Sequence, residues 1–162
     1  MKKNSYFPLF IDMKGKKTII FGGGQVASRR AAVLLNFQAD VKVVAEQMSE
    51  RLWELNEKYE NLTLVLQSYE TYGFELELRH GSIPFYVIAA TNLDWLNHDI
   101  TDCCKQYHIL VTNAGASEEC SVYFPAVVQD EELTIGIVSE KKEHAKVKAF
   151  KAKLIDMLRR KL

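Results

Sequence analysis

Short apolar runs alternate with helix-like segments over the first two thirds of the chain. A β-branched and aromatic run from Thr18 to Phe21 precedes three glycines. From Gln25 to Phe37 the apolar residues recur at helical intervals, and Val41 to Val44 form the next short apolar run. The first 45 residues therefore predict a β-α-β unit with the glycines at the turn between the first strand and the helix.

The same alternation continues to residue 112. We expect further strands at residues 62–66, 85–90 and 109–112, and helices at residues 49–58 and 93–107. The pattern assigns residues 67–84 to no element. Strands that alternate with helices indicate a parallel sheet covered on both faces, so the predicted class is a Rossmann-like, doubly wound α/β fold.

The pattern changes near Asn113. Residues 123–128 and 133–138 predict a hairpin, and apolar positions at helical spacing between residues 147 and 158 predict an amphipathic helix. A segment of this size cannot bury a core alone, since domains below about 40 to 60 residues are marginal without staples. We therefore expect a dinucleotide-binding domain at residues 1–114 and a dimerisation segment at residues 115–162, which pairs with a second copy in a homodimer.

Composition narrows the class of protein. The 162 residues are 48% hydrophobic and carry no net charge, which excludes a disordered or collagen-like chain. No apolar stretch approaches the roughly 18 residues of a membrane helix, and no secretory signal pattern is present, so we expect a cytoplasmic protein. The three cysteines lack CxxC spacing and the histidines share no spacing, so neither a disulfide framework nor a metal site is expected.

The charge is unevenly distributed. From Lys141 to the end, 9 residues are basic and 2 are acidic, whereas the rest of the chain is acidic. One interpretation is a solvated helix face or a tail that docks on the acidic body, and the other is a surface for an anionic ligand or nucleic acid.

The glycines fit a dinucleotide-binding fingerprint, Gly22-x-Gly24-x-x-Ala27. In this motif the first glycine makes the turn, the second admits the pyrophosphate, and the third small residue lets the helix pack on the strand. The helix N-terminus offers free N–H groups to the pyrophosphate. The alternative is a glycine turn kept only for close packing. The expected cofactor contacts here are Gly22, Gly23, Gly24, Gln25 and Val26.

Further cofactor candidates follow the other strands. Glu46 stands where a carboxylate usually binds the adenosine ribose, and it would repel a 2′-phosphate and favour NAD over NADP. Gln47 offers the same hydrogen bond, and an exposed surface glutamate is the alternative. Thr91 and Asn92 end the fourth strand and Asn113 ends the fifth, at the ligand-binding edge of the sheet. For Thr91 and Asn92 the alternative is a helix cap.

Four motifs together resemble one family. They are Tyr6-Phe-Pro-Leu-Phe-Ile-Asp12, Ile20-Phe-Gly-Gly-Gly-Gln-Val-Ala-Ser-Arg-Arg30, Val87-Ile-Ala-Ala-Thr-Asn92 and Tyr123-Phe-Pro-Ala126. The chain resembles the siroheme synthase N-terminal domain, a precorrin-2 dehydrogenase and sirohydrochlorin ferrochelatase, from residue 6 to about residue 140. The opening Phe-Pro-Leu with the glycine block is much more specific than the glycines alone.

The resemblance implies a dimeric Rossmann protein with an interlocked β-rich dimerisation region. It implies NAD-dependent oxidation of precorrin-2 to sirohydrochlorin, and some members also insert ferrous iron. The family's cofactor contacts fall on residues 22–26 and on Glu46 and Gln47. The implied partners are the tetrapyrrole and a second copy of the chain, with no nucleic acid and no membrane. Because the substrates are octacarboxylates, residues 141–153 have an electrostatic reason to be basic.

Two departures from the family matter. The family's presumed acid/base aspartate, ten residues before Pro125, corresponds to Gly115, which cannot move a proton. Glu118 and Glu119 are the candidates to replace it. The usual glycine- and serine-rich turn before the last helix is replaced by residues 140–144. We therefore expect NAD binding with slow or absent dehydrogenation.

Three functions remain open at this point. The first is precorrin-2 dehydrogenation, with chelation as a lesser role. The second is a family member that has lost catalysis and acts as a dimeric NAD- or tetrapyrrole-binding protein. The third is an NAD-sensing regulatory domain of a transport system, against which the Phe-Pro-Leu opening and the Phe-Pro hairpin argue.

Overall fold

The computed structural model describes residues 7–139 and 143–159, which form two compact units. One unit, Ile11–Val122, contains the parallel sheet. In the other, residues 7–10 join residues 123–159. The expectations for Tyr6 and for residues 140–142 lie outside the described residues.

This division differs from the expected boundary at residue 114. Residues 115–122 belong to the sheet unit because they hydrogen-bond back onto its last strand. The N–H groups of Ser121 and Val122 both donate to the carbonyl oxygen of Val111, at 3.0 and 3.3 Å. The hydroxyl of Thr112 donates to the carbonyl oxygen of Val122 at 2.8 Å.

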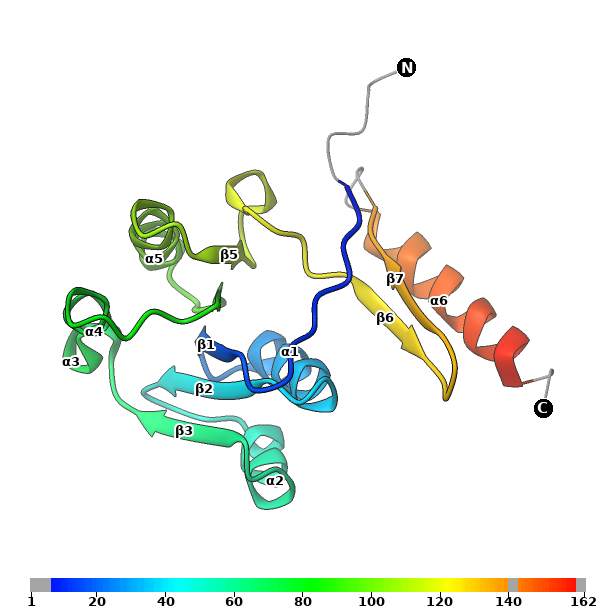
Figure 1. Ribbon diagram of the computed structural model, residues 1–162, viewed down its shortest axis with the longest axis horizontal. Coiled ribbons are helices and arrows are strands. Elements are labelled where there is room, and N and C mark those ends of the chain that lie inside the picture. Colours follow the sequence, from blue (N-terminus) through cyan, green and yellow to red (C-terminus); the bar gives the residue numbers. More distant parts are fainter. Residues whose placement is uncertain (1–6, 140–142, 160–162) are drawn as a thin grey trace. The chain divides into compact units, whose positions relative to one another are not determined.

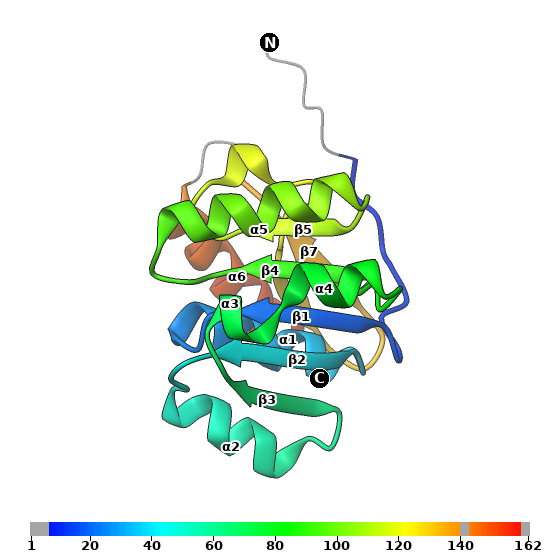
Figure 2. The same ribbon diagram turned by 90° about the vertical axis from the view of Figure 1, so that its left-hand side faces the viewer.

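Five parallel strands form the sheet. They are β1 (Lys17–Phe21), β2 (Asp40–Ala45), β3 (Leu62–Leu66), β4 (Tyr86–Ala89) and β5 (Leu110–Asn113). Their order is β3-β2-β1-β4-β5, which Figure 2 shows from bottom to top. The chain winds outward from β1 to β3 and then returns to the other side of β1. The carboxyl ends of β1 and β4 therefore form the switch point at which such sheets bind ligands.

Helices cover both faces of this sheet, as Figure 1 shows, which confirms the predicted doubly wound class. One face carries α1 (Gln25–Asn36) and α2 (Glu50–Lys58), and the other carries α3 (Tyr69–Tyr72), α4 (Phe74–Arg79) and α5 (Asp94–Gln106). None of the helices in the described part of the chain is long and apolar enough to cross a membrane.

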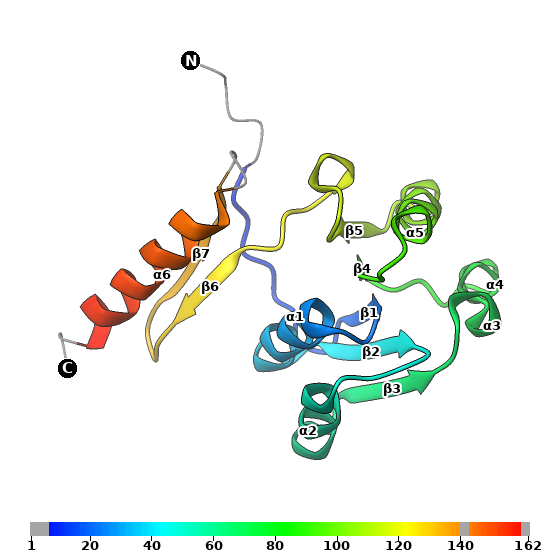
Figure 3. The same cartoon turned by 180° about the vertical axis from the view of Figure 1, so that it is seen from behind.

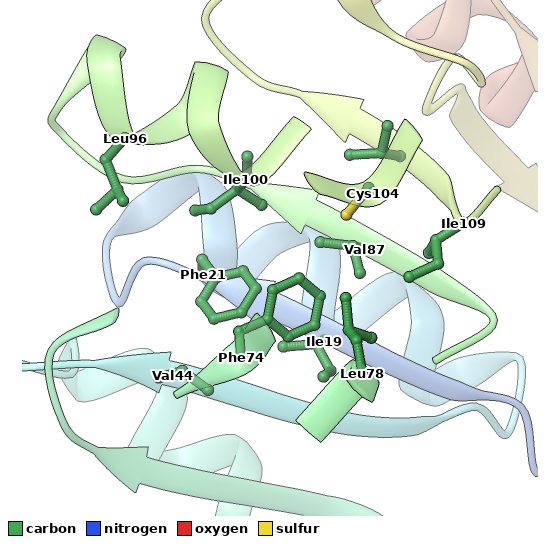
Figure 4. Close-up of a cluster of buried hydrophobic side chains, with 12 residues drawn as sticks. Ile19, Phe21, Val44, Phe74, Leu78, Val87, Leu96, Ile100, Cys104 and Ile109 are labelled. Atoms are coloured by element: carbon green, nitrogen blue, oxygen red, sulfur yellow. The ribbon is translucent and has the colours of Figure 1, made fainter. Parts of the chain in front are cut away.

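The helices α3 and α4 occupy the segment that the sequence pattern assigned to no element. Phe74 and Leu78 of α4 are buried in an apolar cluster with residues of β1, β2, β4 and α5 (Figure 4). The rings of Phe21 and Phe74 lie edge to face with centroids 5.0 Å apart. With only six residues, α4 is too short to show a helical period in the sequence. The hydrophobic pattern therefore could not predict this helix, which is stabilised by its tertiary packing.

The second unit contains the predicted hairpin and the predicted last helix. Strands β6 (Ala126–Gln129) and β7 (Thr134–Ile137) pair antiparallel. Helix α6 (His144–Arg159) lies against this hairpin, as Figure 3 shows. The exposed large apolar side chains of this unit include Phe7, Phe10, Phe150 and Met157. These side chains leave apolar surface of the unit uncovered.

Candidate functional site

Two of the three glycines between β1 and α1 are required by packing. Gly22 has a φ of +115°, and a Cβ atom there would lie 2.2 Å from the carbonyl oxygen of Ala90. A Cβ atom on Gly23 would lie 1.9 Å from the carbonyl oxygen of Gln47. These short distances show that the glycine turn packs directly against the loops that follow β2 and β4. Close packing therefore requires glycine at both positions, and their contacts with the cofactor stay a prediction.

Gly24 has a different environment, because among the described residues no atom beyond its neighbours in the chain lies within 4 Å of the place where its Cβ would be. It precedes α1, whose first hydrogen bond runs from the N–H of Ser28 to the carbonyl oxygen of Gly24 at 3.0 Å. The N–H groups of Gln25, Val26 and Ala27 therefore lie ahead of the helical ladder and are oriented toward the helix N-terminus. Open space beside these donors fits the pyrophosphate of a dinucleotide.

The predicted ribose contacts lie next to this turn. Glu46 and Gln47 directly follow β2, and both are exposed. The N–H of Ser49 donates to the carbonyl oxygen of Gly23 at 2.8 Å, which holds the loop after β2 against the glycine turn. The exposure of Glu46 fits a ribose contact and a surface glutamate equally, so its role stays a prediction.

Thr91, after β4, is held by a side chain that the sequence reading did not identify. Buried Asn97 of α5 accepts a hydrogen bond from the N–H of Thr91 at 2.9 Å and donates to its carbonyl oxygen at 3.1 Å. The Thr91 hydroxyl donates to the Asn97 Oδ1 atom at 2.8 Å and accepts from the N–H of Leu93. The side chain of Thr91 therefore organises the turn before α5, while Asn92 is exposed.

Replacing Asn97 by alanine should destabilise the turn that supports the glycine motif. The change removes both partners of the Thr91 backbone, and leaving such groups unpaired costs about 1–3 kcal/mol. Urea unfolding measures the loss of stability. Asn92→Ala is the matched control in the same turn and should change the unfolding free energy by less than about 0.5 kcal/mol. Equal losses in the two variants would contradict the assignment.

Asn113, at the end of β5, shapes the loop that follows. Its Oδ1 atom accepts hydrogen bonds from the N–H groups of Gly115 and Ala116, at 2.9 and 3.1 Å. The loop is tied to the sheet because the N–H of Ala114 donates to the carbonyl oxygen of Ala89 at 2.8 Å. Burial raises the pKa of the Cys120 thiol, whose sulfur accepts from the N–H of Asn113 at 3.2 Å. The side-chain oxygen of Asn113 is thus already used by hydrogen bonds within this loop.

Gly115 does not need to be glycine for conformational reasons. It is absent from the glycines with positive φ, and a Cβ there would make ordinary contacts with the Asp94 and Asn113 Oδ1 atoms, at 3.5 and 3.6 Å. A carboxylate from Asp94 therefore faces the position where the family's aspartate would project.

The two candidate replacements for that aspartate differ. Glu118 is exposed and accepts a long hydrogen bond of 3.5 Å from the hydroxyl of Ser117. Glu119 is held on both carboxylate oxygens: its Oε2 atom accepts from the Asn113 amide at 3.0 Å, and its Oε1 atom lies 2.5 Å from the Nδ1 atom of His98. The sequence carried no signal for His98, because its partner lies on a different element.

Metal ligands do not gather in this part of the protein. Among residues 7–139 and 143–159, no three His, Cys, Asp or Glu side chains could together hold a metal ion.

Comparison with known families decides the class of cofactor. The profile of the family described as "Putative NAD(P)-binding" matches residues 9–126, well over half of the chain. The chain belongs to this family. The match covers the glycine turn and the loops after β2, β4 and β5. The prediction of a nicotinamide dinucleotide cofactor is thereby confirmed.

Relatives of this NAD(P)-binding chain are proteins of siroheme biosynthesis. It is 38% identical over 144 residues to the probable multifunctional siroheme biosynthesis protein HemA of Ruminiclostridium josui, covering 88% of this chain and 26% of that protein. It is 33% identical over 153 residues to the siroheme synthase of Zymomonas mobilis, covering 94% and 31%. The chain thus spans about a quarter to a third of these curated relatives, and the expected family resemblance is confirmed.

A solved structure supports the same fold. The structure of SirC, precorrin-2 dehydrogenase, superposes with a TM-score of 0.70 at 24% identity, covering 92% of this chain and 69% of that one. At this level of identity the likeness establishes the Rossmann-like fold.

Proposed function

We propose that the chain oxidises precorrin-2 to sirohydrochlorin with NAD as the acceptor. The observation that carries the proposal is one connected edge of the sheet, where the open turn at Gly24 and the loop around Gly115 are joined through β4. The turn packs so closely on β4 that a Cβ on Gly22 would clash with the carbonyl oxygen of Ala90, and the carbonyl oxygen of Ala89 accepts a hydrogen bond from the N–H of Ala114. The names of the relatives, siroheme synthases and a siroheme biosynthesis protein, support the choice of substrate.

The chemistry requires the removal of a hydride and a proton from the tetrapyrrole. NAD, when bound, supplies the nicotinamide ring that accepts the hydride. The residues of the chain orient it: the turn at Gly24 and the first N–H groups of α1 hold the pyrophosphate. In the strand order, β4 and β5 lie on one side of β1 and β2 lies on the other, so the loops after β4 and β5 are separated from the loop after β2 by the switch point. Glu46, which follows β2, would contact the adenosine half of NAD.

Anaerobic incubation with precorrin-2 and NAD tests the proposal, with sirohydrochlorin absorbance as the readout. Formation of sirohydrochlorin with stoichiometric NADH supports it. A protein that binds NAD but forms no product contradicts it, and the second candidate, a binding protein that has lost catalysis, then stands. Gly115 is the observation that favours this second candidate, since glycine provides no proton acceptor.

We expect NAD to bind more tightly than NADP. Glu46 is exposed beside the glycine turn, and its charge would repel the 2′-phosphate of NADP. Titration of both cofactors gives the ratio of the dissociation constants for NADP and NAD. This ratio should be smaller in Glu46→Gln than in the unmodified protein. Glu50 is an exposed carboxylate at the start of α2, and Glu50→Gln is the control, which should keep the preference for NAD of the unmodified protein. Equal affinities in the unmodified protein would remove Glu46 from this role.

We expect a homodimer through the unit that contains α6. Phe150 and Met157 are 54% and 61% exposed, and a hairpin with one helix buries too little apolar surface to cover them. Light scattering at micromolar concentration should give twice the chain mass. The double variant Phe150→Glu and Met157→Glu should be monomeric, whereas Lys148→Glu, on the opposite face of the same helix, should stay dimeric. A monomeric unmodified protein would contradict the proposal.

Two further expectations belong to the same proposal. The exposed lysines of α6 would attract an octacarboxylate substrate over long range. We place the protein in the cytoplasm, which the three free thiols support, because reducing compartments keep cysteines unpaired.

A further inference from the structure

Four polar residues meet beside the position where the family's aspartate is missing. Asp94 and His98 come from the first two turns of α5, Asn113 ends β5, and Glu119 follows in a short 3₁₀ helix, Ser117–Glu119. Residues four apart lie on the same face of a helix, about 6 Å from each other at Cβ. The Asp94 Oδ1 atom lies 3.5 Å from the place of a Cβ on Gly115, and His98 follows Asp94 by one helical turn on the same face of α5.

The carboxylate of Glu119 is fixed between two donors. Its Oε2 atom accepts from the amide of Asn113 at 3.0 Å, and its Oε1 atom contacts the His98 Nδ1 atom at 2.5 Å. The Glu119 side chain is 25% exposed, so this contact is partly shielded from water. Asn113 in turn is held by the backbone of the loop, which leaves the carboxylate little freedom to reorient.

This contact determines which nitrogen of His98 is available. A carboxylate at Nδ1 places the proton of a neutral imidazole on Nδ1 and leaves the lone pair on Nε2. The His98 side chain is 48% exposed, so Nε2 can be reached by a molecule bound at this edge of the sheet. A histidine oriented by a carboxylate is a recurring arrangement for proton transfer in enzymes.

We infer that His98, oriented by Glu119, accepts the proton released during tetrapyrrole oxidation, in place of the family's aspartate. The inference rests on the proposed function. A C–H bond of the substrate breaks and its hydrogen leaves with the electron pair as a hydride to NAD, which is reduced to NADH. A proton leaves the substrate for the Nε2 atom of His98, which later releases it to water. His98 is the catalytic residue in this scheme, and Glu119 is a positioning residue.

Substitution of His98 separates proton transfer from cofactor binding. His98→Gln should lower kcat for precorrin-2 oxidation by about 100-fold or more, since a positioned acid/base group contributes roughly 10²–10⁴-fold. The KM for the tetrapyrrole and the Kd for NAD should stay unchanged, because Gln fits an exposed helix position and the glycine turn is untouched. His80→Gln, an exposed histidine at the end of α4, is the matched control and should keep full activity.

A rescue experiment distinguishes a chemical role from a structural one. Adding Gly115→Asp to His98→Gln restores a carboxylate at the family's position, and this double variant should recover kcat at least about tenfold. Glu119→Gln keeps an oxygen for the Nδ1 atom but removes the charge, so kcat should fall while NAD affinity stays constant. If His98→Gln loses NAD binding, its kcat cannot test the proton-transfer role, and the kcat of Glu119→Gln is used in its place. An unchanged kcat in Glu119→Gln overturns the inference.

The outcomes separate this inference from the proposed function. Turnover by the unmodified protein with unchanged kcat in His98→Gln overturns the inference and leaves the proposed function standing. No recovery in the double variant, with NAD binding intact, also overturns it. An unmodified protein that binds NAD without any turnover overturns the proposed function itself, and the inference with it.

Discussion

Gly24→Val should weaken NAD binding roughly tenfold or more, a loss of about 1.4 kcal/mol of binding free energy, while the protein stays folded. The side chain would enter the open space beside the first N–H groups of α1, where the pyrophosphate is expected. Apart from its neighbours in the chain, no described residue has an atom within 4 Å of the new Cβ atom, so this atom clashes with nothing in the described apoprotein. Titration calorimetry measures the affinity, and circular dichroism measures the fold.

Gly22→Val is the informative contrast to this variant. Its backbone has a φ of +115°, and the new Cβ atom would lie 2.2 Å from the carbonyl oxygen of Ala90. Backbone strain of this kind costs about 1–3 kcal/mol before the clash is added. We therefore expect Gly22→Val to lower the melting temperature without NAD, and Gly24→Val to leave it unchanged. Unchanged NAD affinity in Gly24→Val would overturn the assignment of the cofactor to this turn.

Local patterns in the sequence predicted the parts of the fold whose cause is local. The run before Gly22 is β-branched and aromatic, and α1 buries the predicted apolar positions Ala27, Ala31, Leu34 and Leu35, whereas Val26 is exposed. The same holds for the hairpin of β6 and β7, since two short apolar runs flank a polar turn. In these segments each residue's neighbours along the chain determine its conformation.

Long-range contacts account for what the sequence did not predict. In the sequence, Asn97 is indistinguishable from the other polar residues of α5. Its hydrogen bonds with the backbone of Thr91 show that it fixes the turn before the helix. His98 shares no spacing with another histidine, and its partner Glu119 comes from the loop after β5. Likewise, the hydrogen bond of Ser121 back to β5 joins residues 115–122 to the sheet unit, and no local pattern indicates that bond.

The short helix α4 is the clearest case of an element defined by tertiary packing, and Phe74→Ala should expose that dependence. Phe74 is 1% exposed and packs edge to face on Phe21, the residue before Gly22. Removing a fully buried phenylalanine side chain costs about 3–5 kcal/mol, because the lost contacts leave a cavity. Urea unfolding should therefore show a large drop in stability, and NAD affinity should fall with it if the end of β1 shifts.

Leu76→Ala on the same helix provides the control for that prediction. Leu76 is 59% exposed, so its truncation should change the unfolding free energy by less than about 0.5 kcal/mol. Both substitutions place alanine in the same six-residue helix and have similar effects on helix propensity. The difference between them therefore isolates the packing of Phe74 against β1. Equal losses of stability would mean that α4 does not depend on this contact, and that its position over Phe21 has another cause.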